Sequence, residues 1–124
     1  MKILIVDDDD IMLQLIVHQL KNLGEHDVIT ATNGKNAIRL VKEQQPDLII
    51  TDLLMPIASG TELVEYVREK LKVSAYIIVV SAMGLEHVQQ EALDMGANRF
   101  MTKPFDLAQL LECIQEVNSI SQAS

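Results

Sequence analysis

Five polar side chains in this 124-residue sequence lie at the ends of short apolar runs: Asp7, Asp8, Asp52, Ser81 and Lys103. Three of them are carboxylates, which repel one another when they are brought together and resist ionising at the same time. A hard divalent cation is their natural counter-ion. Mg²⁺ suits carboxylate and phosphate oxygens and keeps several of its waters.

Such a set of groups could carry out phosphoryl transfer. One carboxylate would act as a nucleophile toward phosphorus. The cation and the lysine would neutralise charge on the equatorial phosphoryl oxygens, and the hydroxyl could donate to one of them. Each group also has a purely structural interpretation. An aspartate after a strand is often a helix N-cap, the role we expect for Asp10, whereas we expect Asp9 to be a solvated loop acid.

The elements that must position these groups alternate along the chain. Short β-branched runs predict strands over Lys2–Val6, Asp27–Ala31, Leu48–Thr51, Tyr76–Val80 and Arg99–Met101. Helical spacing of apolar residues predicts helices over Ile11–Leu23, Lys35–Gln44, Thr61–Leu71, His87–Met95 and Leu107–Val117.

This alternation predicts an α/β fold, with a five-stranded parallel sheet, doubly wound by five helices. In open α/β sheets, ligands bind beyond the carboxyl ends of the strands, at the topological switch point. In the strand order 2-1-3-4-5, the first and third strands flank that point. Asp7, Asp8 and Asp52 would therefore converge there, with Ser81 and Lys103 beside them.

Composition narrows the possible partners and compartments. The formal net charge is -8, from 18 acidic and 10 basic residues, which disfavours direct binding of nucleic acid or of an anionic membrane surface. A lone cysteine, Cys113, cannot form an internal disulfide and fits a reducing cytoplasm, as a small core or half-buried residue. The first residues do not resemble a signal peptide. We expect one domain over residues 1–119 and a polar tail over 120–124.

Four segments, taken together, resemble the receiver domain of two-component response regulators. They read ILIVDDD, DLIITDLLMP with Gly60 eight residues after Asp52, IIVVSA, and GANRFMTKPF. The spacings between them match as well, and the resemblance covers essentially the whole chain. It implies the flavodoxin-like fold of that family.

The resemblance also implies roles at the matching positions. Asp52 corresponds to the phosphoryl acceptor. Asp7 and Asp8 correspond to the acidic pair that holds Mg²⁺, for which Mn²⁺ could substitute, with Asp8 bound directly and Asp7 through water. The backbone carbonyl of Leu54 would be a further metal ligand. Lys103 would pair with the phosphoryl group.

The remaining matched positions concern switching. Ser81 corresponds to the switch hydroxyl and Phe100 to the aromatic switch residue, and Pro104 follows the lysine through what is a cis bond in many relatives. A histidine kinase or histidine phosphotransfer protein would donate the phosphoryl group. The face formed by the fourth helix, fifth strand and fifth helix, residues 85–117, would then control a partner or output domain. The resemblance implies a signalling switch rather than an enzyme, as a monomer or a weak phosphorylation-dependent dimer.

Two features of the sequence depart from parts of the family. Leu54 and Met83 stand where side chains tune hydrolysis of the phosphoryl group, and both are apolar, so we expect slow autodephosphorylation. The last predicted helix, DLAQLLECIQEV, carries no basic residue. This argues against the charged dimer of receivers that drive winged-helix domains and favours a stand-alone regulator or another kind of output.

Two other classes of protein fit the sequence less well. A receiver-like adaptor that works without phosphorylation would usually have lost the acceptor, an acid or the lysine, and all are present. An aspartyl phosphatase would need a second acid at Leu54. A flavodoxin would need a Ser/Thr/Gly-rich loop where Asp7–Asp10 stand, and the Gly-Lys-Ser/Thr of a P-loop enzyme is missing.

Overall fold

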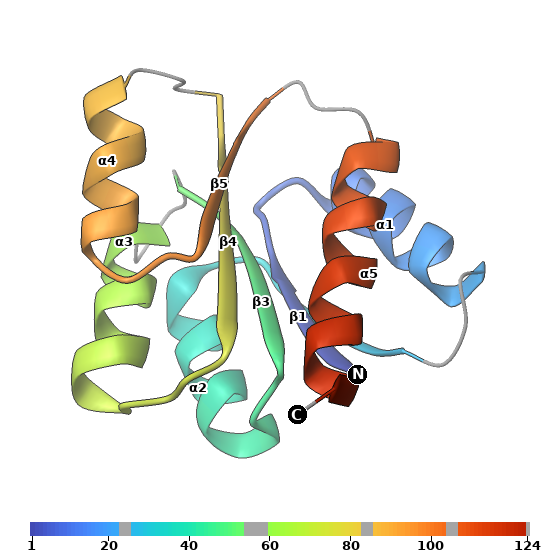
Figure 1. Ribbon diagram of the computed structural model, residues 1–124, viewed down its shortest axis with the longest axis horizontal. Helices are drawn as coiled ribbons and strands as arrows, with labels where there is room; N and C mark the ends of the chain where they lie inside the picture. Colours follow the sequence, from blue (N-terminus) through green and yellow to red (C-terminus); the bar gives the residue numbers. More distant parts are fainter. Residues whose placement is uncertain (23–25, 54–59, 83–85, 104–106, 124) are drawn as a thin grey trace.

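A computed structural model describes residues 1–22, 26–53, 60–82, 86–103 and 107–123 (Figure 1). Its five strands are β1 (Lys2–Val6), β2 (Asp27–Ala31), β3 (Leu48–Asp52), β4 (Tyr76–Ser81) and β5 (Arg99–Thr102). They form one parallel sheet in the order β2-β1-β3-β4-β5. The predicted fold class and strand order are therefore confirmed.

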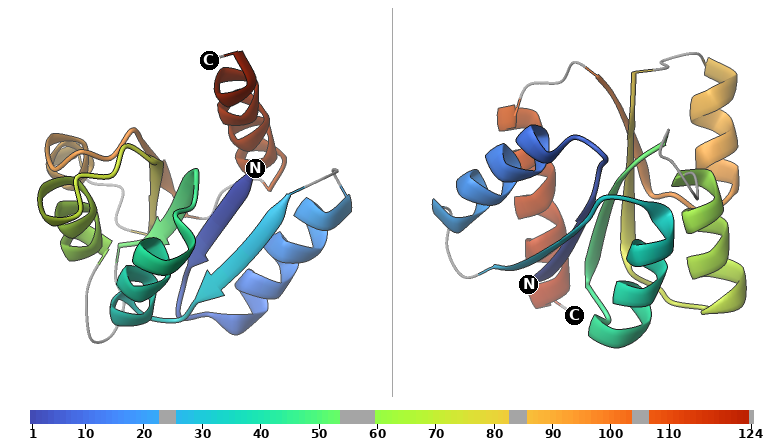
Figure 2. Two further views of the ribbon diagram at one scale, coloured as in Figure 1. Left: turned by 90° about the horizontal axis from the view of Figure 1, so that it is seen from below. Right: turned by 180° about the vertical axis from the view of Figure 1, so that it is seen from behind.

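The helices cover both faces of the sheet (Figure 2). They are α1 (Asp10–Asn22), α2 (Gly34–Gln44), α3 (Gly60–Glu65) with its continuation η1 (Tyr66–Lys70), α4 (Glu86–Asp94) and α5 (Leu107–Ala123). One face carries α1 and α5, and the other carries α2, α3 and α4. None of the helices in the described ranges combines the length and the apolar character needed to traverse a bilayer.

The core has two layers because successive strand residues point to opposite faces of the sheet. In β1, Leu4 and Val6 pack with α2, α3 and α4, whereas Ile3 and Ile5 pack with α1 and α5. All four are at most 1% exposed. The continuous apolar runs of the sequence are thus strands buried on both faces, which is typical of a parallel sheet. Such strands hold the residues at their ends in a fixed relation.

The prediction of an α-helix over Thr61–Leu71 was wrong for its second half, which is a π-helix. The α-helix gives way to a π-helical turn, Tyr66–Lys70, in which the Leu71 N–H donates to the Tyr66 carbonyl at 3.0 Å. The apolar spacing cannot distinguish the two, because a π turn adds only one residue to a helix. The turn carries Arg68, whose guanidinium donates to the carbonyls of Val73 and Gly96, at 2.7 and 2.9 Å.

Two further predictions concern α5. Cys113 is 5% exposed in the core beside α1, so its interpretation as a core residue is confirmed. Burial raises the pKa of its thiol, which makes it a poor nucleophile. The helix does not end at Val117, as the apolar stripe predicted, but continues to Ala123. The polar segment expected to form a tail is therefore helical as far as that residue.

Candidate functional site

The polar residues singled out in the sequence meet at the carboxyl end of the sheet. Asp7 follows β1, Asp52 and Ser81 end β3 and β4, and Lys103 follows β5. The strand register aligns Asp52 with Val80 and Ser81 with Thr102. The Lys103 N–H donates to the Ser81 carbonyl at 2.7 Å, which fixes the chain beyond β5 next to the end of β4.

The ammonium of Lys103 lies between two carboxylates. Its Nζ donates to Oδ2 of Asp7 and to Oδ2 of Asp52, each at 3.0 Å. Asp7 and Asp52 are only 5% and 9% exposed. Burial by itself would lower the pKa of Lys103, but the hydrogen bonds to both carboxylates and their charges outweigh it, so the pKa is raised. The lysine is a fixed positive charge within this site.

Three carboxylates could hold a divalent cation at this position. Oxygens of Asp7, Asp8 and Asp52 all lie within 4.8 Å of one another. Asp7 and Asp52 are buried while Asp8 is exposed, so the group opens to solvent on one side. An all-oxygen donor set with room for waters fits Mg²⁺ or Mn²⁺ and does not fit a metal that prefers nitrogen or sulfur ligands.

The run Asp7–Asp10 divides differently from the expectation. The carboxylate of Asp9 accepts from the N–H groups of Ile11 and Met12, at 3.0 and 3.3 Å, and its carbonyl accepts from Leu13 at 3.1 Å. These are the bonds of an N-cap residue, so the prediction that Asp10 caps the helix was wrong. Asp10 is the first residue of α1, where its charge favours the helix dipole.

A second aspartate of the run also organises the backbone. Oδ1 of Asp7 accepts from the N–H of Asp9 at 2.9 Å, while its Oδ2 accepts from Lys103. One carboxylate thus shapes the turn after β1 and contacts the lysine. Nothing in the sequence indicates this double use, because it depends on how the chain turns between β1 and α1.

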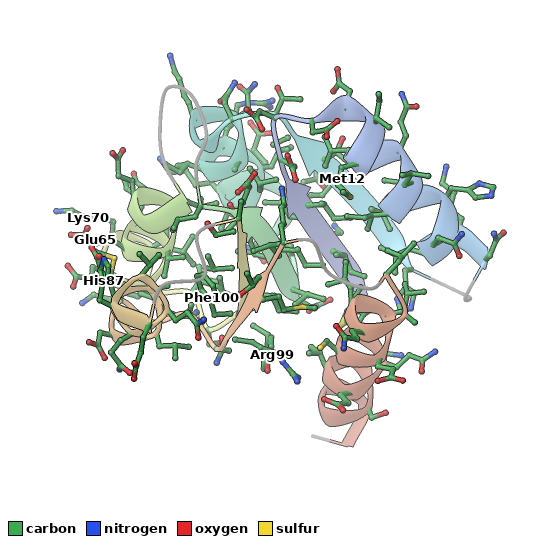
Figure 3. All side chains as sticks on the ribbon, turned by 90° about the horizontal axis from the view of Figure 1, so that it is seen from above. Met12, Glu65, Lys70, His87, Arg99 and Phe100 are labelled. Carbon is green, nitrogen blue, oxygen red and sulfur yellow. The ribbon has the colours of Figure 1, made fainter. Side chains whose placement is uncertain are left out.

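The two switch candidates differ in their surroundings. Ser81 is fully buried at the end of β4. Phe100 is half-buried on β5 and packs against the core layer that contains Val88 and Ala92 of α4. Figure 3 shows Phe100 on the α4 side of β5 and Arg99 on the opposite side. Phe100 therefore borders the space between the sheet and α4.

One buried residue beside the site was not singled out in the sequence. The hydroxyl of Thr51 donates to the backbone carbonyl of Asp52 at 3.0 Å, and Thr51 has no exposed surface. This bond helps to fix the backbone that carries the carboxylate. Nothing in the sequence distinguishes it from any other threonine in a strand. Three predicted positions, Leu54, Met83 and Pro104, lie outside the described residues.

Fold and site together define a class, a doubly wound α/β protein with an acidic, lysine-bridged site at its switch point. Comparison of the sequence with known families identifies the same class. The family described as "Response regulator receiver domain" matches residues 3–115. The chain belongs to this family, whose members are signalling switches of two-component systems and are generally not classed as enzymes.

Individual relatives agree with this assignment. The chemotaxis protein CheY of Thermotoga maritima is 33% identical over 117 residues, which are 94% of this chain and 97% of that protein. The transcriptional regulatory protein PhoP of Bacillus subtilis, named for alkaline phosphatase synthesis, is 36% identical over 104 residues. The match spans 84% of this chain but 42% of PhoP. The receiver domain of the Francisella response regulator 1452 superposes with a TM-score of 0.90 at 28% identity, covering 97% and 98% of the two chains.

Proposed function

We propose that this chain is a phosphorylation-controlled switch in which Asp52 accepts the phosphoryl group. The observation that carries the proposal is the position of its carboxylate. It lies at the carboxyl end of a fully buried strand, beside Asp7 and Asp8, and accepts a hydrogen bond from Lys103 at 3.0 Å. Asp7 is less suited to be the acceptor, because its two oxygens already accept hydrogen bonds from Asp9 and Lys103. Asp8 is exposed to solvent. We therefore assign Asp7 and Asp8 to holding a cation.

The transfer conserves atoms and charge in a simple way. An oxygen of Asp52 attacks phosphorus of a phosphohistidine on a kinase or phosphotransfer protein, and a P–O bond forms as the P–N bond breaks. The electron pair of that bond returns to the imidazole nitrogen of the donor, and a proton taken from water restores the neutral imidazole. Lys103, which contacts Asp52 before the reaction, would contact an oxygen of the transferred group afterwards.

The site residues fit a magnesium ion during this step. Asp7, Asp8 and Asp52 would hold it, together with the backbone carbonyl of Leu54, and Mn²⁺ would be an acceptable substitute. The ion supplies positive charge that offsets the negative charge of the phosphoryl oxygens. The remaining electrostatic compensation comes from Lys103.

Phosphorylation would act on the partner surface through two side chains. The new group adds nearly two negative charges and three acceptor oxygens. The hydroxyl of Ser81 would move toward them, and the ring of Phe100 would fill the space that Ser81 vacates. These movements bias a two-state equilibrium of the face formed by α4, β5 and α5. Through this face the chain would control a partner protein or an output domain, as a monomer or a weak phosphorylation-dependent dimer.

The experiment that tests the proposal uses a small phosphoryl donor. The protein is incubated with acetyl phosphate and Mg²⁺, and its intact mass is measured. We expect the wild type to gain the mass of one phosphoryl group and Asp52→Asn to gain none. Omission of Mg²⁺ should abolish the gain in the wild type. A wild-type protein that is not labelled would favour an adaptor that binds partners without phosphorylation.

A further inference from the structure

The outer edge of the sheet next to α5 is open. β5 pairs with β4 through one edge, and within the described residues no strand pairs with the other. A groove of about 380 Å³ follows this edge. Its walls are the whole of β5, residues Arg99–Thr102, and the α5 side chains Gln109, Glu112, Cys113 and Glu116. An open edge presents backbone donors and acceptors that an extended segment can use.

The charged side chains that line this groove are mostly negative. Glu112 and Glu116 are exposed, one helical turn apart on α5. Arg99 is the cation of the groove lining, and its guanidinium already contacts Glu116 at 3.3 Å. No lysine, arginine or histidine occurs in residues 107–123, and α4 on the other side of β5 contains no lysine or arginine. Among the described residues of the lining, two glutamates therefore face one cation, which is already paired with Glu116.

The spacing of the two glutamates matches an extended ligand. Residues four apart on a helix are about 6 Å apart along its axis. Alternate residues of a β-strand lie about 6.6 Å apart and point the same way. Two basic side chains separated by one residue in an extended segment could therefore face Glu112 and Glu116 together. The residue between them would point away from α5.

A second copy of this chain fits the groove poorly. A symmetric pairing would place two negative α5 helices near each other, and the cation that the described groove lining offers in return, Arg99, is already paired with Glu116. Like charges across an interface are unfavourable. The charge pattern instead selects a partner that carries the missing cations.

We propose that the groove between the edge of β5 and α5 docks an extended, Lys/Arg-bearing segment of a partner protein, with its basic side chains on Glu112 and Glu116. This inference states the chemistry of the partner. Its regulation rests on the proposed function of the face formed by α4, β5 and α5, although the docking itself needs no phosphoryl group. Backbone pairing with β5 supplies affinity, and the glutamates select basic sequences. Because Phe100 and Arg99 come from the same short strand, movement of the ring on one side would alter the strand that lines the groove on the other.

The test uses two synthetic probes of equal length, one of alternating lysine and threonine and the other of alternating glutamate and threonine. Binding to the full chain is measured by fluorescence anisotropy without a phosphoryl donor, and the site is mapped by amide NMR shifts. We expect the basic probe alone to bind, with the largest shifts in Arg99–Thr102 and around Glu112 and Glu116. The double variant Glu112→Lys/Glu116→Lys should weaken binding about tenfold, since two attractions become repulsions.

A matched variant separates local from overall charge. Glu65→Lys/Glu69→Lys changes the net charge equally on two exposed residues of the opposite layer, and should leave the affinity within about twofold. Circular dichroism checks that both variants are folded. Equal weakening by both variants, shifts elsewhere, binding of the acidic probe, or no binding of the basic probe would each overturn the proposal. A dimer detected by sedimentation, with amide NMR shifts that place its interface in this groove, would also overturn it. Asp52→Asn should bind the basic probe like the wild type, so a failure at Asp52 is distinguishable from a failure here.

Discussion

Replacement of Lys103 by methionine should destabilise the protein far more than an ordinary surface substitution. The change keeps most of the side-chain volume and removes the ammonium that bridges Asp7 and Asp52. Both carboxylates then remain at the end of the sheet, nearly buried and without this shared partner. Breaking a buried charge pair is costly mainly because the remaining charge is left uncompensated.

The magnitude follows from the geometry. Carboxylate oxygens of Asp7 and Asp52 lie within 4.8 Å of each other, and two unit charges at that separation repel by about 3 kcal/mol at an effective dielectric constant of about 20. Loss of one member of a fully buried pair costs about 3–5 kcal/mol. The Lys103 side chain keeps 22% of its exposure, so part of the interaction is already screened. We therefore expect a loss of about 2–4 kcal/mol in the absence of divalent cations.

Urea unfolding in EDTA measures this loss. With a slope of about 2 kcal/mol per molar urea, the midpoint of Lys103→Met should fall by about 1–2 M. Lys35→Met, the same change on the exposed surface of α2, should alter the stability by less than about 0.5 kcal/mol. Adding Asp52→Asn to Lys103→Met should recover part of the loss, and Mg²⁺ should recover more in Lys103→Met than in the wild type. An unchanged midpoint, or no recovery in the double variant, would refute the electrostatic reasoning.

Three further predictions address the cap, the pH dependence and the phosphoryl lifetime. Asp9→Ala should lower the free energy of unfolding by about 1 kcal/mol in urea titrations, because the Asp9 carboxylate accepts from the N–H groups of Ile11 and Met12. Asp10→Ala should lower it by much less, and equal losses would refute the assignment of Asp9 as the N-cap. Burial and the nearby N-terminal charge lower the pKa of His26 from 6.5, so the unfolded chain binds the proton more readily and the urea midpoint should fall as pH drops below about 6.5. His26→Gln should flatten that fall, and an unaltered pH profile would contradict the assignment. Leu54→Asn combined with Met83→Gln should shorten the lifetime of the phosphorylated protein, measured by loss of label; an unchanged lifetime would show that these positions do not govern hydrolysis.

The sequence predicted the convergence at the site because it depends on two strong signals. Continuous apolar runs identify strands buried on both faces, and parallel strands in a doubly wound sheet bring their carboxyl ends to one edge. The placement of Asp7, Asp52 and Lys103 follows from these rules alone. The rules do not say which atoms meet. That one ammonium bridges Asp7 and Asp52 depends on the side-chain conformation of Lys103, which no spacing in the sequence determines.

The errors concern the start, the type and the end of individual helices. Asp9 and Asp10 are both good N-caps by type, and a shift of one residue in the start of α1 decides between them. The π turn that begins at Tyr66 keeps apolar residues at spacings that an α-helix would also show, so the pattern cannot distinguish the two. Helix α5 passes beyond its last predicted apolar position because serine, asparagine and glutamine are tolerated in a final helical turn. Each error concerns a local boundary, and none alters the residues that meet at the site.

The position of the acquired phosphoryl group tests the central claim most directly. An acyl phosphate on a carboxylate is reduced by borohydride to an alcohol, which marks the modified aspartate permanently as homoserine. The protein is phosphorylated with acetyl phosphate and Mg²⁺, reduced, digested and sequenced by mass spectrometry. We predict the mark at position 52 alone. A mark at position 7 or 8, or an unmarked position 52 in a protein that has gained phosphoryl mass, would contradict the assignment of Asp52 as the acceptor.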